Sequence, residues 1–584
     1  MTVESLITQH IDTWTSTVKT KSTSGRGSSK KLELYGVKKL RELILELAVR
    51  GKLVPQDPND EPASVQLAAI KKEQLKLIKE KKIKKPKPLP SIDSLDKPFS
   101  LPVGWDWELF GNVCHIERGG SPRPIKSFIT DNPNGLNWIK IGDTDIGGKY
   151  ITSTEEKIRP EGLSKTRQVF PGDFLLTNSM SFGRPYITKI EGCIHDGWLR
   201  ISPPSTLDKD YLYSLLSSPF IVRSFKKSAA GAVVMNLNAD KVRETIVAIP
   251  PNEEQHHIVA KVDELMTLCD QLEQQTEASI EAHQLLVSTL LNTLTNSADA
   301  DELMENWKRI SNHFDTLFTT EASIDQLKQT ILQLAVMGKL VPQDPNDEPA
   351  SVLLERIAEE KTQLIKDKKI KKQKALPPIA DDEKPFELPK GWEWIRLGAL
   401  TSLVTSGSRG WNKYYSDSGA TFIRSQDIKY DRVEFDNRAF VELPQSTEGK
   451  RTKVDLGDIL VTITGANVGK AAVVEQELPE AYVSQHVSLI KLMDQRLSPY
   501  IHLWLTGSHG GRLHLLSQSY GDKPGLNLQN INELVVPVAP EEHQLLVLTK
   551  VDQLMELCER LKQRLCDSQQ TQLKLTDAIV EQAL

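Results

Sequence analysis

The side chains best suited to recognise a ligand in this sequence lie in short loops that are rich in glycine. Residues 117–127 read ERGGSPRPIKS and residues 181–189 read SFGRPYITK, and loops of the same kind recur at residues 406–427 and 520–525. Arginine can donate two hydrogen bonds to guanine, asparagine or glutamine can bind adenine, and Ser, Lys and backbone amides can hold phosphate. The loops therefore predict contacts with nucleic acid. Each residue taken alone is equally compatible with an ordinary exposed loop.

The candidate DNA-binding residues share a side chain that can donate hydrogen bonds and a position in one of these loops. They are Arg118, Arg123, Lys126, Ser181 and Arg184 in the earlier region, and Arg409, Lys413, Tyr414, Arg424 and Lys523 in the later region. A lysine-rich run at residues 71–87, with an echo at 361–374, has two interpretations. It is either a solvated helix face or a surface close to a phosphate backbone.

The sequence lacks the motifs of known catalytic sites. GANVGK (465–470) is followed by Ala471, whereas a phosphate-binding P-loop needs one more residue before its GK and then Ser or Thr. His256 and His257 are better explained as an exposed helix turn than as a metal pair. There is no HExxH, no GxSxG and no GxGxxG in a strand–helix context. The chain is therefore predicted to bind and position other molecules without catalysis or a metal of its own.

Composition points to a soluble protein of a reducing cytoplasm. Hydrophobic residues make up 39% and charged residues 26% of the 584 positions. No apolar run approaches the roughly 20 residues that span a bilayer, and the N-terminal residues lack the pattern of a signal peptide. The five cysteines form no CxxC pair. A formal net charge of −5 excludes a globally basic surface but allows local basic faces.

The segments that position these glycine-rich loops include a block of sequence that occurs twice in the chain. Residues 47–65 read LAVRGKLVPQDPNDEPASV, and residues 334–352 repeat them with Met337 in place of Arg50. The repetition continues through LIKEKKIKK and LIKDKKIKK to LPVGWDW (101–107) and LPKGWEW (388–394). Two long copies differ from a solenoid, which needs at least about three short repeats. A two-lobed molecule with pseudo-twofold symmetry is expected.

Each copy contains a mixed α/β lobe between helices. The first lobe (residues 105–250) and the second lobe (residues 392–540) contain short β-branched and aromatic runs broken by Gly, Pro, Asn and Asp, which is typical of strands and turns. Single helices are predicted at 211–227 and 499–517, and a flexible loop at 19–31. The lobes differ extensively while the segments around them are nearly identical. The fold class is therefore predicted to be α+β.

A long helix follows each lobe, the first at about 253–294. Both helices carry apolar residues at alternating steps of three and four, which is the pattern of a coiled-coil seam. The seam residues include Val262, Leu265, Cys269 and Leu272 in the first helix, and Val551, Leu554, Cys558 and Leu561 in the second. We expect the first seam to pair with the helix that ends at Gly338, and the second with the helix that ends at Gly51. The alternative is that each seam pairs with another chain.

The order of these motifs resembles the specificity (S) subunits of type I restriction–modification enzymes. Each lobe opens with LPxGWxW, contains GD[FI]L and a glycine turn, and closes with LNADKV (237–242) or LNLQNI (526–531) before the long helix. The resemblance covers essentially the whole chain, and the repeated block is most similar to the type IB branch. One departure concerns the turn after GD-x-L, which reads TNSMSFG in the first lobe and TGANVG in the second.

The resemblance implies two target-recognition domains, at 99–250 and 386–538. They would be separated by helical regions at 1–98 and 251–385, with the C-terminal helix at 539–584 pairing with the N-terminal region. Each domain would bind one half of a split site in double-stranded DNA. Antiparallel coiled-coil helix pairs would fix the spacing and dock two methyltransferase (M) subunits.

The cofactors of such a complex would belong to the partners. S-adenosylmethionine for adenine methylation, and ATP and Mg²⁺ for the restriction (R) subunits, are expected there and not on this chain. The alternative function is a coiled-coil adaptor that binds only proteins. An adaptor would need neither two divergent lobes nor loops that mix Arg, Asn and aromatic residues. The bases recognised, the spacer length and the methylated adenine are not encoded in any pattern that we can interpret.

Overall fold

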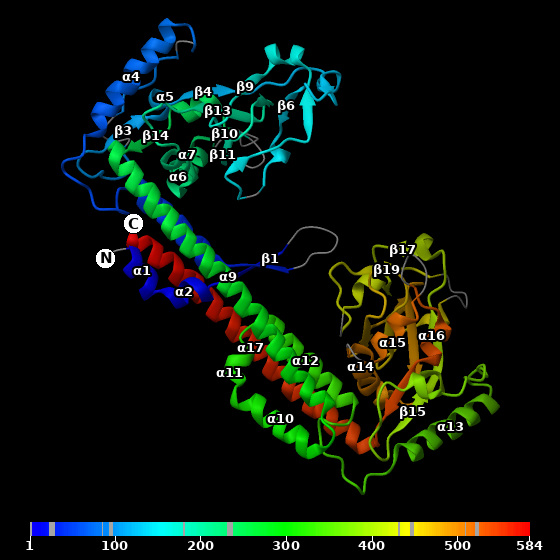
Figure 1. Cartoon of the computed structure of the whole chain (residues 1–584). Helices are drawn as coiled ribbons and strands as arrows, with labels where there is room; N and C mark the ends of the chain where they lie inside the picture. The colour runs from blue at the N-terminus through cyan, green and yellow to red at the C-terminus, as the bar shows by residue number, and fades with distance from the viewer. Residues whose placement is uncertain are drawn as a thin grey trace. The chain divides into compact units, whose positions relative to one another are not determined.

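The chain forms two compact units in the computed structural model. The structure describes residues 3–22, 30–83, 86–92, 97–145, 147–178, 182–229, 237–429, 432–443, 449–507, 510–519 and 525–584. Unit 1 comprises Met1–Ser279 and Ser568–Leu584, and unit 2 comprises Ile280–Asp567. Two long helices, α9 (Asn252–Asn296) and α17 (Glu541–Ala583), contribute residues to both units (Figure 1). The predicted helix at 253–294 is confirmed as α9.

Unit 1 contains the first lobe and the helices before it. Its elements are α1 (Val3–Gln9), α2 (Ile11–Ser16), β1 (Lys19–Ser22), β2 (Lys30–Glu33), α3 (Tyr35–Val49), α4 (Ala63–Lys79), β3 (Asp106–Leu109), α5 (Phe110–Val113), β4 (His115–Arg118), β5 (Ile129–Thr130), β6 (Leu136–Ile139), β7 (Tyr150–Ile151), β8 (Glu156–Ile158), β9 (Arg167–Val169), β10 (Phe174–Thr177), β11 (Pro185–Thr188), β12 (Gly192–Ile194), β13 (Trp198–Ser202), α6 (Lys209–Ser217), α7 (Pro219–Ala229), α8 (Ala239–Arg243) and β14 (Ile246–Ile249).

Unit 2 contains the second lobe and the helices before it. Its elements are α10 (Ala300–Asn312), α11 (Phe314–Leu317), α12 (Glu321–Val336), α13 (Ala350–Lys366), β15 (Glu393–Arg396), β16 (Thr401–Ser406), β17 (Tyr415–Ser416), β18 (Ala420–Ile423), β19 (Ala439–Val441), β20 (Ile459–Thr462), β21 (Ala471–Val473), β22 (Ala481–Val483), β23 (Val487–Leu492), α14 (Ser498–Thr506), α15 (Gly511–Ser517), α16 (Leu528–Glu533) and β24 (Val535–Val538).

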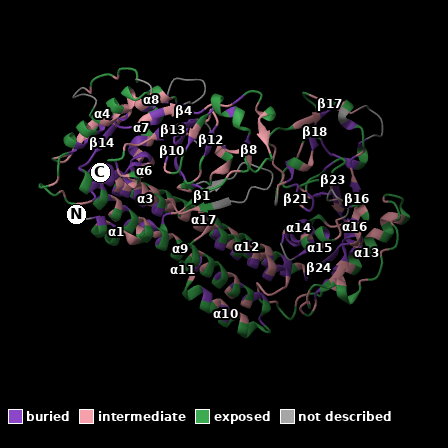
Figure 2. Cartoon of the chain, turned by 45° about the horizontal axis from the view of Figure 1, so that its top comes forward, coloured by how far each residue is buried: buried purple, intermediate pink, exposed green. Residues whose placement is uncertain are grey.

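The two lobes share a sheet topology. The main sheet has the order β4-β13-β10-β11-β7 in the first lobe and β16-β23-β20-β21 in the second. A second sheet in each lobe is built around a parallel pair, β6–β12 or β18–β22. A separate antiparallel pair, β3–β14 or β15–β24, joins the start of each lobe to its end. The predicted α+β fold with mixed sheets is therefore observed. The central strands, β10, β11 and β12 in the first lobe and β20, β21, β22 and β23 in the second, are largely buried (Figure 2).

In unit 1 the apolar stripe of α9 packs against α3. Leu265 and Cys269 of α9 belong to the same buried cluster as Leu40 and Ile44 of α3. At the edge of this contact, Arg41 Nη2 lies 2.7 Å from Asp270 and 2.6 Å from Glu273. The end of α17 joins the same unit, where Thr576 Oγ1 lies 3.0 Å from Thr17 Oγ1.

In unit 2 the stripe of α17 packs against α12 in the equivalent way. Val551 and Cys558 are buried in one cluster with Leu327 and Ile331, and Leu554 and Leu561 pack against that cluster. Ion pairs flank the contact at 2.5 Å between Lys328 and Glu559 and between Lys562 and Asp325. The last turns of α9 complete the cluster through Val287, Leu291 and Leu294.

The predicted partners of the two stripes were therefore wrong. The residues Val262, Leu265, Cys269 and Leu272 contact α3, which ends at Gly51, and not the helix that ends at Gly338. The reason is length, because α9 has 45 residues and is followed by α10 and α11 before α12 begins. A helix that folds back after α11 reaches only the last turns of α9. Each stripe is buried by helices of this chain, so a second chain is not needed to cover it.

Glycine at the end of α3 and α12 allows each helix to dock on its lobe. Gly51 has φ +67° and Gly338 has φ +69°, the left-handed conformation that ends a helix. A Cβ atom on Gly51 would lie 2.4 Å from Pro102 Cγ, and one on Gly338 would lie 2.6 Å from Pro389 Cγ. The near-identity of the repeated block therefore has a steric origin. Both copies pack the same helix end against the same LPxGW segment.

The one substitution between the repeated blocks has an electrostatic explanation. Arg50 Nη2 binds Glu46 Oε1 at 2.9 Å, and Arg223 of α7 binds the same oxygen at 2.5 Å. Glu46 is only 1% exposed. The position equivalent to Glu46 in the second copy is Gln333, which needs no cation, and the position of Arg50 is occupied by Met337. A buried carboxylate without a cation is costly, so the two positions change together.

Three local predictions needed correction. The helix predicted at 211–227 is two helices, α6 and α7, because Pro219 lacks a backbone donor and begins a new helix. The helix predicted at 499–517 is likewise divided into α14 and α15. The predicted loop at 19–31 has strands at both ends, β1 and β2, which pair in antiparallel register.

The packing of α9 on α3 predicts a large loss of stability for Leu265→Ala. Leu265 is 1% exposed, and truncating a buried leucine costs about 2–5 kcal/mol. The matched control is Leu285→Ala on the same helix, where the side chain is 68% exposed. The free energy of unfolding in urea should fall for Leu265→Ala and stay close to that of the parent for Leu285→Ala. Equal effects of the two substitutions would contradict the observed packing.

Candidate nucleic-acid interface

Polar side chains lie together at one end of the strands of the main sheet in the first lobe. The strands β4, β13, β10 and β11 are neighbours in antiparallel order, so the end of β4, the start of β13, the end of β10 and the start of β11 lie at the same edge. Arg118 ends β4, Asn178 follows β10 and Arg184 precedes β11. We call this the reading edge of the first lobe.

Asp196, which lies just before β13, organises the reading edge. Ser121 Oγ donates to Asp196 Oδ1 at 2.8 Å, and Asn178 Nδ2 and Arg118 Nε donate to the Asp196 carbonyl at 2.7 and 3.3 Å. Arg123 lies 3.6 Å from the carboxylate and is 82% exposed. The hydrogen bond from Ser121 lowers the pKa of Asp196. The backbone carbonyl of Asp196 thus holds Arg118, and its carboxylate attracts Arg123, at one end of the sheet.

The other candidates of the first lobe are placed differently. Arg184 is exposed, and its backbone N–H donates to Thr177 Oγ1 at 2.9 Å, which fixes the turn into β11. Lys126 is exposed in a short 3₁₀ turn (Ile125–Ser127). Ser181 lies outside the described residues. The structure therefore brings together Arg118, Arg123 and the Arg184 turn.

The second lobe has an equivalent reading edge with different residues. Here the strand order β16-β23-β20-β21 places Ser406, His486 and Thr464 at one edge. Thr464 Oγ1 and His486 Nδ1 are hydrogen-bonded, and Gln485 Nε2 lies 3.1 Å from His486 Nε2. Arg409 is exposed in the loop that follows β16. In the strand register, Arg118, Asp196 and Asn178 of the first lobe correspond to Ser406, Gln485 and Ile463 of the second.

Three candidates of the second lobe already have partners, and a fourth lies outside the described residues. The guanidinium of Arg424 donates two hydrogen bonds to Asp427, from Nε to Oδ2 at 3.0 Å and from Nη2 to Oδ1 at 3.1 Å. Arg424 would have to give up these bonds to bind a base. The Lys413 ammonium lies 4.7 Å from the centre of the Tyr414 ring, which contacts Trp411. Lys523 lies outside the described residues.

The aspartates of the GD[FI]L motif have a structural role. Asp173 accepts hydrogen bonds from the Phe170 amide at 2.9 Å and from Arg200 Nε at 3.0 Å. In the second lobe Asp458 accepts from the Asp455 amide at 2.7 Å and pairs with Lys491. Burial raises the pKa of Asp458 despite this pair. The motif closes a turn at the opposite end of the strand from the reading edge.

Sequence reasoning missed Asn178, Asp196, Gln485 and His486. A usable signal exists, because Asn178, Asp196 and His486 are end residues of runs predicted to be strands, and Gln485 immediately precedes one. Its interpretation requires the order of strands in the sheet, which the sequence does not reveal. Within the described part of the chain, no group of three or more His, Cys, Asp or Glu side chains could hold a metal ion. Over the same residues, no helix is long and apolar enough to cross a membrane.

Comparison with known proteins identifies the family. Residues 102–282 match the model of the type I restriction modification DNA specificity domain. The type I restriction enzyme EcoAI specificity subunit of Escherichia coli is 40% identical, and the EcoEI specificity subunit is 42% identical. Both alignments cover 100% of this chain and 100% of the relative.

A solved structure is also similar. The crystal structure of the HsdS subunit from Thermoanaerobacter tengcongensis aligns with 84% of this chain and 98% of its own, at 18% identity and a TM-score of 0.40. The matched domain and the two full-length relatives agree with the motif order described above. This chain therefore belongs to the family of specificity subunits of type I restriction–modification enzymes.

Proposed function

We propose that this specificity subunit recognises a split DNA sequence, with one half bound by the reading edge of each lobe. The proposal rests on one observation: the reading edges of the two lobes differ, whereas the framework that holds them is the same. The two lobes use the same strand order and the same helix-to-lobe contact, yet the side chains at the edges differ. Hydrogen-bonding side chains in the major groove can distinguish all four base pairs. Two lobes with the same framework and different reading-edge side chains are suited to bind two different half-sites.

The long helices are suited to set the spacing of the half-sites. Helix α9 has 45 residues and α17 has 43, so each is roughly 65 Å long. Successive turns of a DNA groove are about 34 Å apart. Helices of this length can therefore separate two binding lobes by one DNA turn or more.

The same helices offer surfaces for partner subunits. Leu286 of α9 and Leu575 of α17 are 50% and 49% exposed. These positions are equivalent in the two helices, as are Leu268 and Leu557, which are 36% and 38% exposed. Exposed apolar side chains repeated on both helices fit two copies of one partner. We propose that this partner is the methyltransferase subunit and that restriction subunits join the same complex.

The chemistry of the complex is assigned to the partners. S-adenosylmethionine would be bound by the methyltransferase subunits, and ATP and Mg²⁺ by the restriction subunits. Methylation of an adenine in a duplex requires the base to be flipped out of the stack. This chain would hold the DNA while a partner acts on the base, and it would have no catalytic residue of its own. Such a complex is expected to act in the cytoplasm.

Exchange of one lobe should change one half of the recognised sequence. Residues 105–250 would be replaced by the corresponding segment of a relative with a known target, and methylated adenines would be mapped across the genome of a strain that carries the hybrid. We expect a new first half with the second half and the spacer retained. A change in both halves would show that the lobes do not act separately.

The arginines around Asp196 should contribute to DNA affinity. Arg118→Gln and Arg123→Gln are each expected to weaken binding to the target duplex by about 1–3 kcal/mol. The assembled methyltransferase complex would be titrated with labelled duplex and followed by fluorescence anisotropy. The control is Arg309→Gln, since Arg309 is exposed on α10 and forms an ion pair with Glu305 of the same helix. If Arg118→Gln and Arg123→Gln both left the DNA affinity unchanged, the reading edge of the first lobe would not be part of the DNA interface.

A further inference from the structure

A cationic groove in unit 2 lies between the linker after α13 and the edge strand β16. It encloses about 790 Å³, and six of its seventeen lining residues are Lys or Arg, whereas one is acidic. The cations are Lys369, Lys371, Lys372, Lys374, Arg451 and Lys491. Ile370, Leu403 and Val404 are half-buried among the other lining residues. None of the reading-edge residues lines this groove.

The charge of the groove is not balanced by the protein. Lys491 is paired with Asp455 at 2.8 Å and with Asp458. Within the described chain, the four linker lysines at 369, 371, 372 and 374 form no ion pair, and all four are exposed. Exposed like charges at such close spacing repel one another and favour a bound anion.

The linker is held in place although its lysines are exposed. Gln373 Nε2 donates to the Thr401 carbonyl at 3.3 Å, at the start of β16. Lys361 Nζ of α13 donates to Gln373 Oε1 at 2.9 Å and to the Gly398 carbonyl at 2.7 Å. These bonds fix the linker along β16, so the lysines that flank Gln373 form a defined surface.

The groove continues to the reading edge of the second lobe. Arg451 lines the groove, and its Nη2 atom donates to the carbonyl of Ser406 at 3.4 Å. Ser406 is the last residue of β16, and Arg409 follows it in the adjacent loop. A row of cations therefore leads along the edge strand to the loop proposed to meet DNA.

A lysine is kept at a conformation that favours glycine. Lys81 and Lys368 have φ +56° and +57° and are the two described non-glycine residues with positive φ. They occupy equivalent C-terminal caps of α4 and α13, closed by the amides of Lys82 and Lys369 bonding back to Leu77 and Leu364 at 2.9 Å. Glycine would fit this position with less strain. Lys368 directly precedes Lys369, the first residue that lines the groove.

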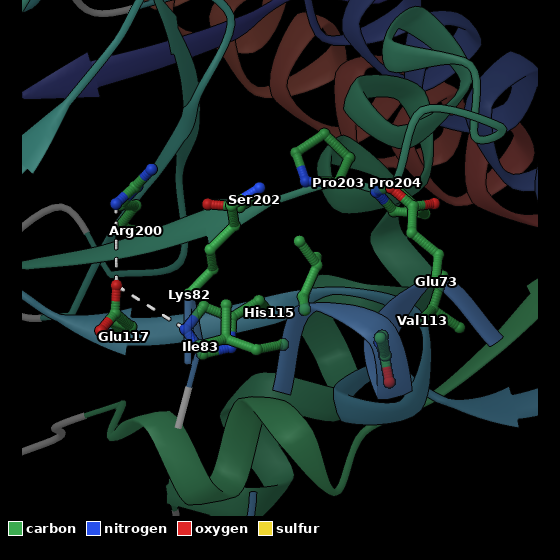
Figure 3. A pocket seen from close by; sticks show the side chains of 12 residues that line it. Glu73, Lys82, Ile83, Val113, His115, Glu117, Arg200, Ser202, Pro203 and Pro204 are labelled. Atoms are coloured by element: carbon green, nitrogen blue, oxygen red, sulfur yellow. Dashed lines mark ion pairs between the residues drawn. The ribbon is translucent and has the colours of Figure 1, made fainter. Parts of the chain in front are cut away.

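Among the described residues, the equivalent groove of unit 1 is smaller and its lining charges are balanced. It encloses about 200 Å³ and is lined by two cations, Lys82 and Arg200, and by two acids, Glu73 and Glu117 (Figure 3). Glu117 lies 3.7 Å from both Arg200 and His115. In unit 2 the strand register places Thr405 at the position of Glu117. In unit 1 the counterparts of Lys371 and Lys372 are Lys84 and Lys85, which lie outside the described residues.

We propose that the linker groove of unit 2 binds the phosphate backbone of duplex DNA outside the bases that the second lobe recognises. The inference rests on the proposed function. Lysine is a hydrated point charge suited to phosphate, and it is depleted in protein–protein interfaces, where arginine and aromatic residues are enriched. A groove rimmed by lysines that leads to the reading edge fits a phosphate backbone better than an acidic protein. Its contribution is independent of base sequence.

Removal of two linker charges tests the proposal. The complex with methyltransferase subunits would carry Lys371→Gln with Lys372→Gln, and its affinity for a target duplex and an unrelated duplex would be measured between about 50 and 200 mM salt. The slope of log K against log salt should become shallower by about 1.8, which corresponds to two lost phosphate contacts. Both duplexes should be affected equally. The charge-matched control, Lys308→Gln with Lys550→Gln, should retain the parental slope.

Lys368→Gly separates binding from folding. Glycine relieves the left-handed conformation, so the melting temperature should be equal to or higher than that of the parent. The salt slope should nevertheless become shallower by about 0.9. A variant that is as stable as the parent and has the parental slope would overturn the role of Lys368.

The outcomes distinguish this inference from the proposed function. If the parental complex bound no DNA, the proposed function itself would fail. If the parent bound with a salt-dependent affinity and the Lys371→Gln, Lys372→Gln complex had the same slope, only the groove proposal would be overturned. Loss of methyltransferase binding with an unchanged DNA slope would show that an acidic protein surface occupies the groove, and that result would also overturn the proposal.

Discussion

The contact between a helix end and the start of a lobe is the constraint on which the rest of the structure depends. In both units a left-handed glycine lets the helix end meet the Pro-x-Gly-Trp segment, where a Cβ atom would collide with proline. In unit 1 the indole of Trp105 donates to Glu254 of α9 at 2.8 Å. In unit 2 the indole of Trp392 donates to Gln343 at 3.1 Å. One contact thereby fixes the helices, the repeated block and the lobe together.

This constraint explains which parts of the two copies stay alike and which differ. The repeated block can change only where its contacts change, as Arg50 and Met337 show beside Glu46 and Gln333. The reading-edge side chains take no part in the contact of Gly51 or Gly338 with its lobe, so they are free to vary. Asp196 organises one edge, whereas Thr464 and His486 form the other. A constant support with variable edges is what recognition of two different half-sites requires.

Much of the fold could be predicted from the sequence, because duplication and apolar periodicity are local signals. The stripe of α9, the helix-ending glycines and the two α/β lobes all follow from patterns within short windows. The partners of the stripes could not be predicted that way, since they depend on the length of α9 and on the insertion of α10 and α11. The site was harder still. From the sequence Arg424 is a suitable side chain to bind a base, yet in the structure it binds Asp427. Arg118 binds the carbonyl of Asp196 because β4 and β13 are neighbours in the sheet, which the sequence does not reveal.

The central claim is that the helix-to-lobe contact supports each unit, and alanine substitution at Gly338 tests it most directly. The control is Gly410→Ala, because Gly410 also has a positive φ of +84° but has no atom within 4 Å of an added Cβ. Urea unfolding would be measured for both variants. Both carry the backbone strain, but only Gly338→Ala adds the collision with Pro389, so we expect it to lose about 1–3 kcal/mol more stability than the control. Equal losses in the two variants would contradict the account.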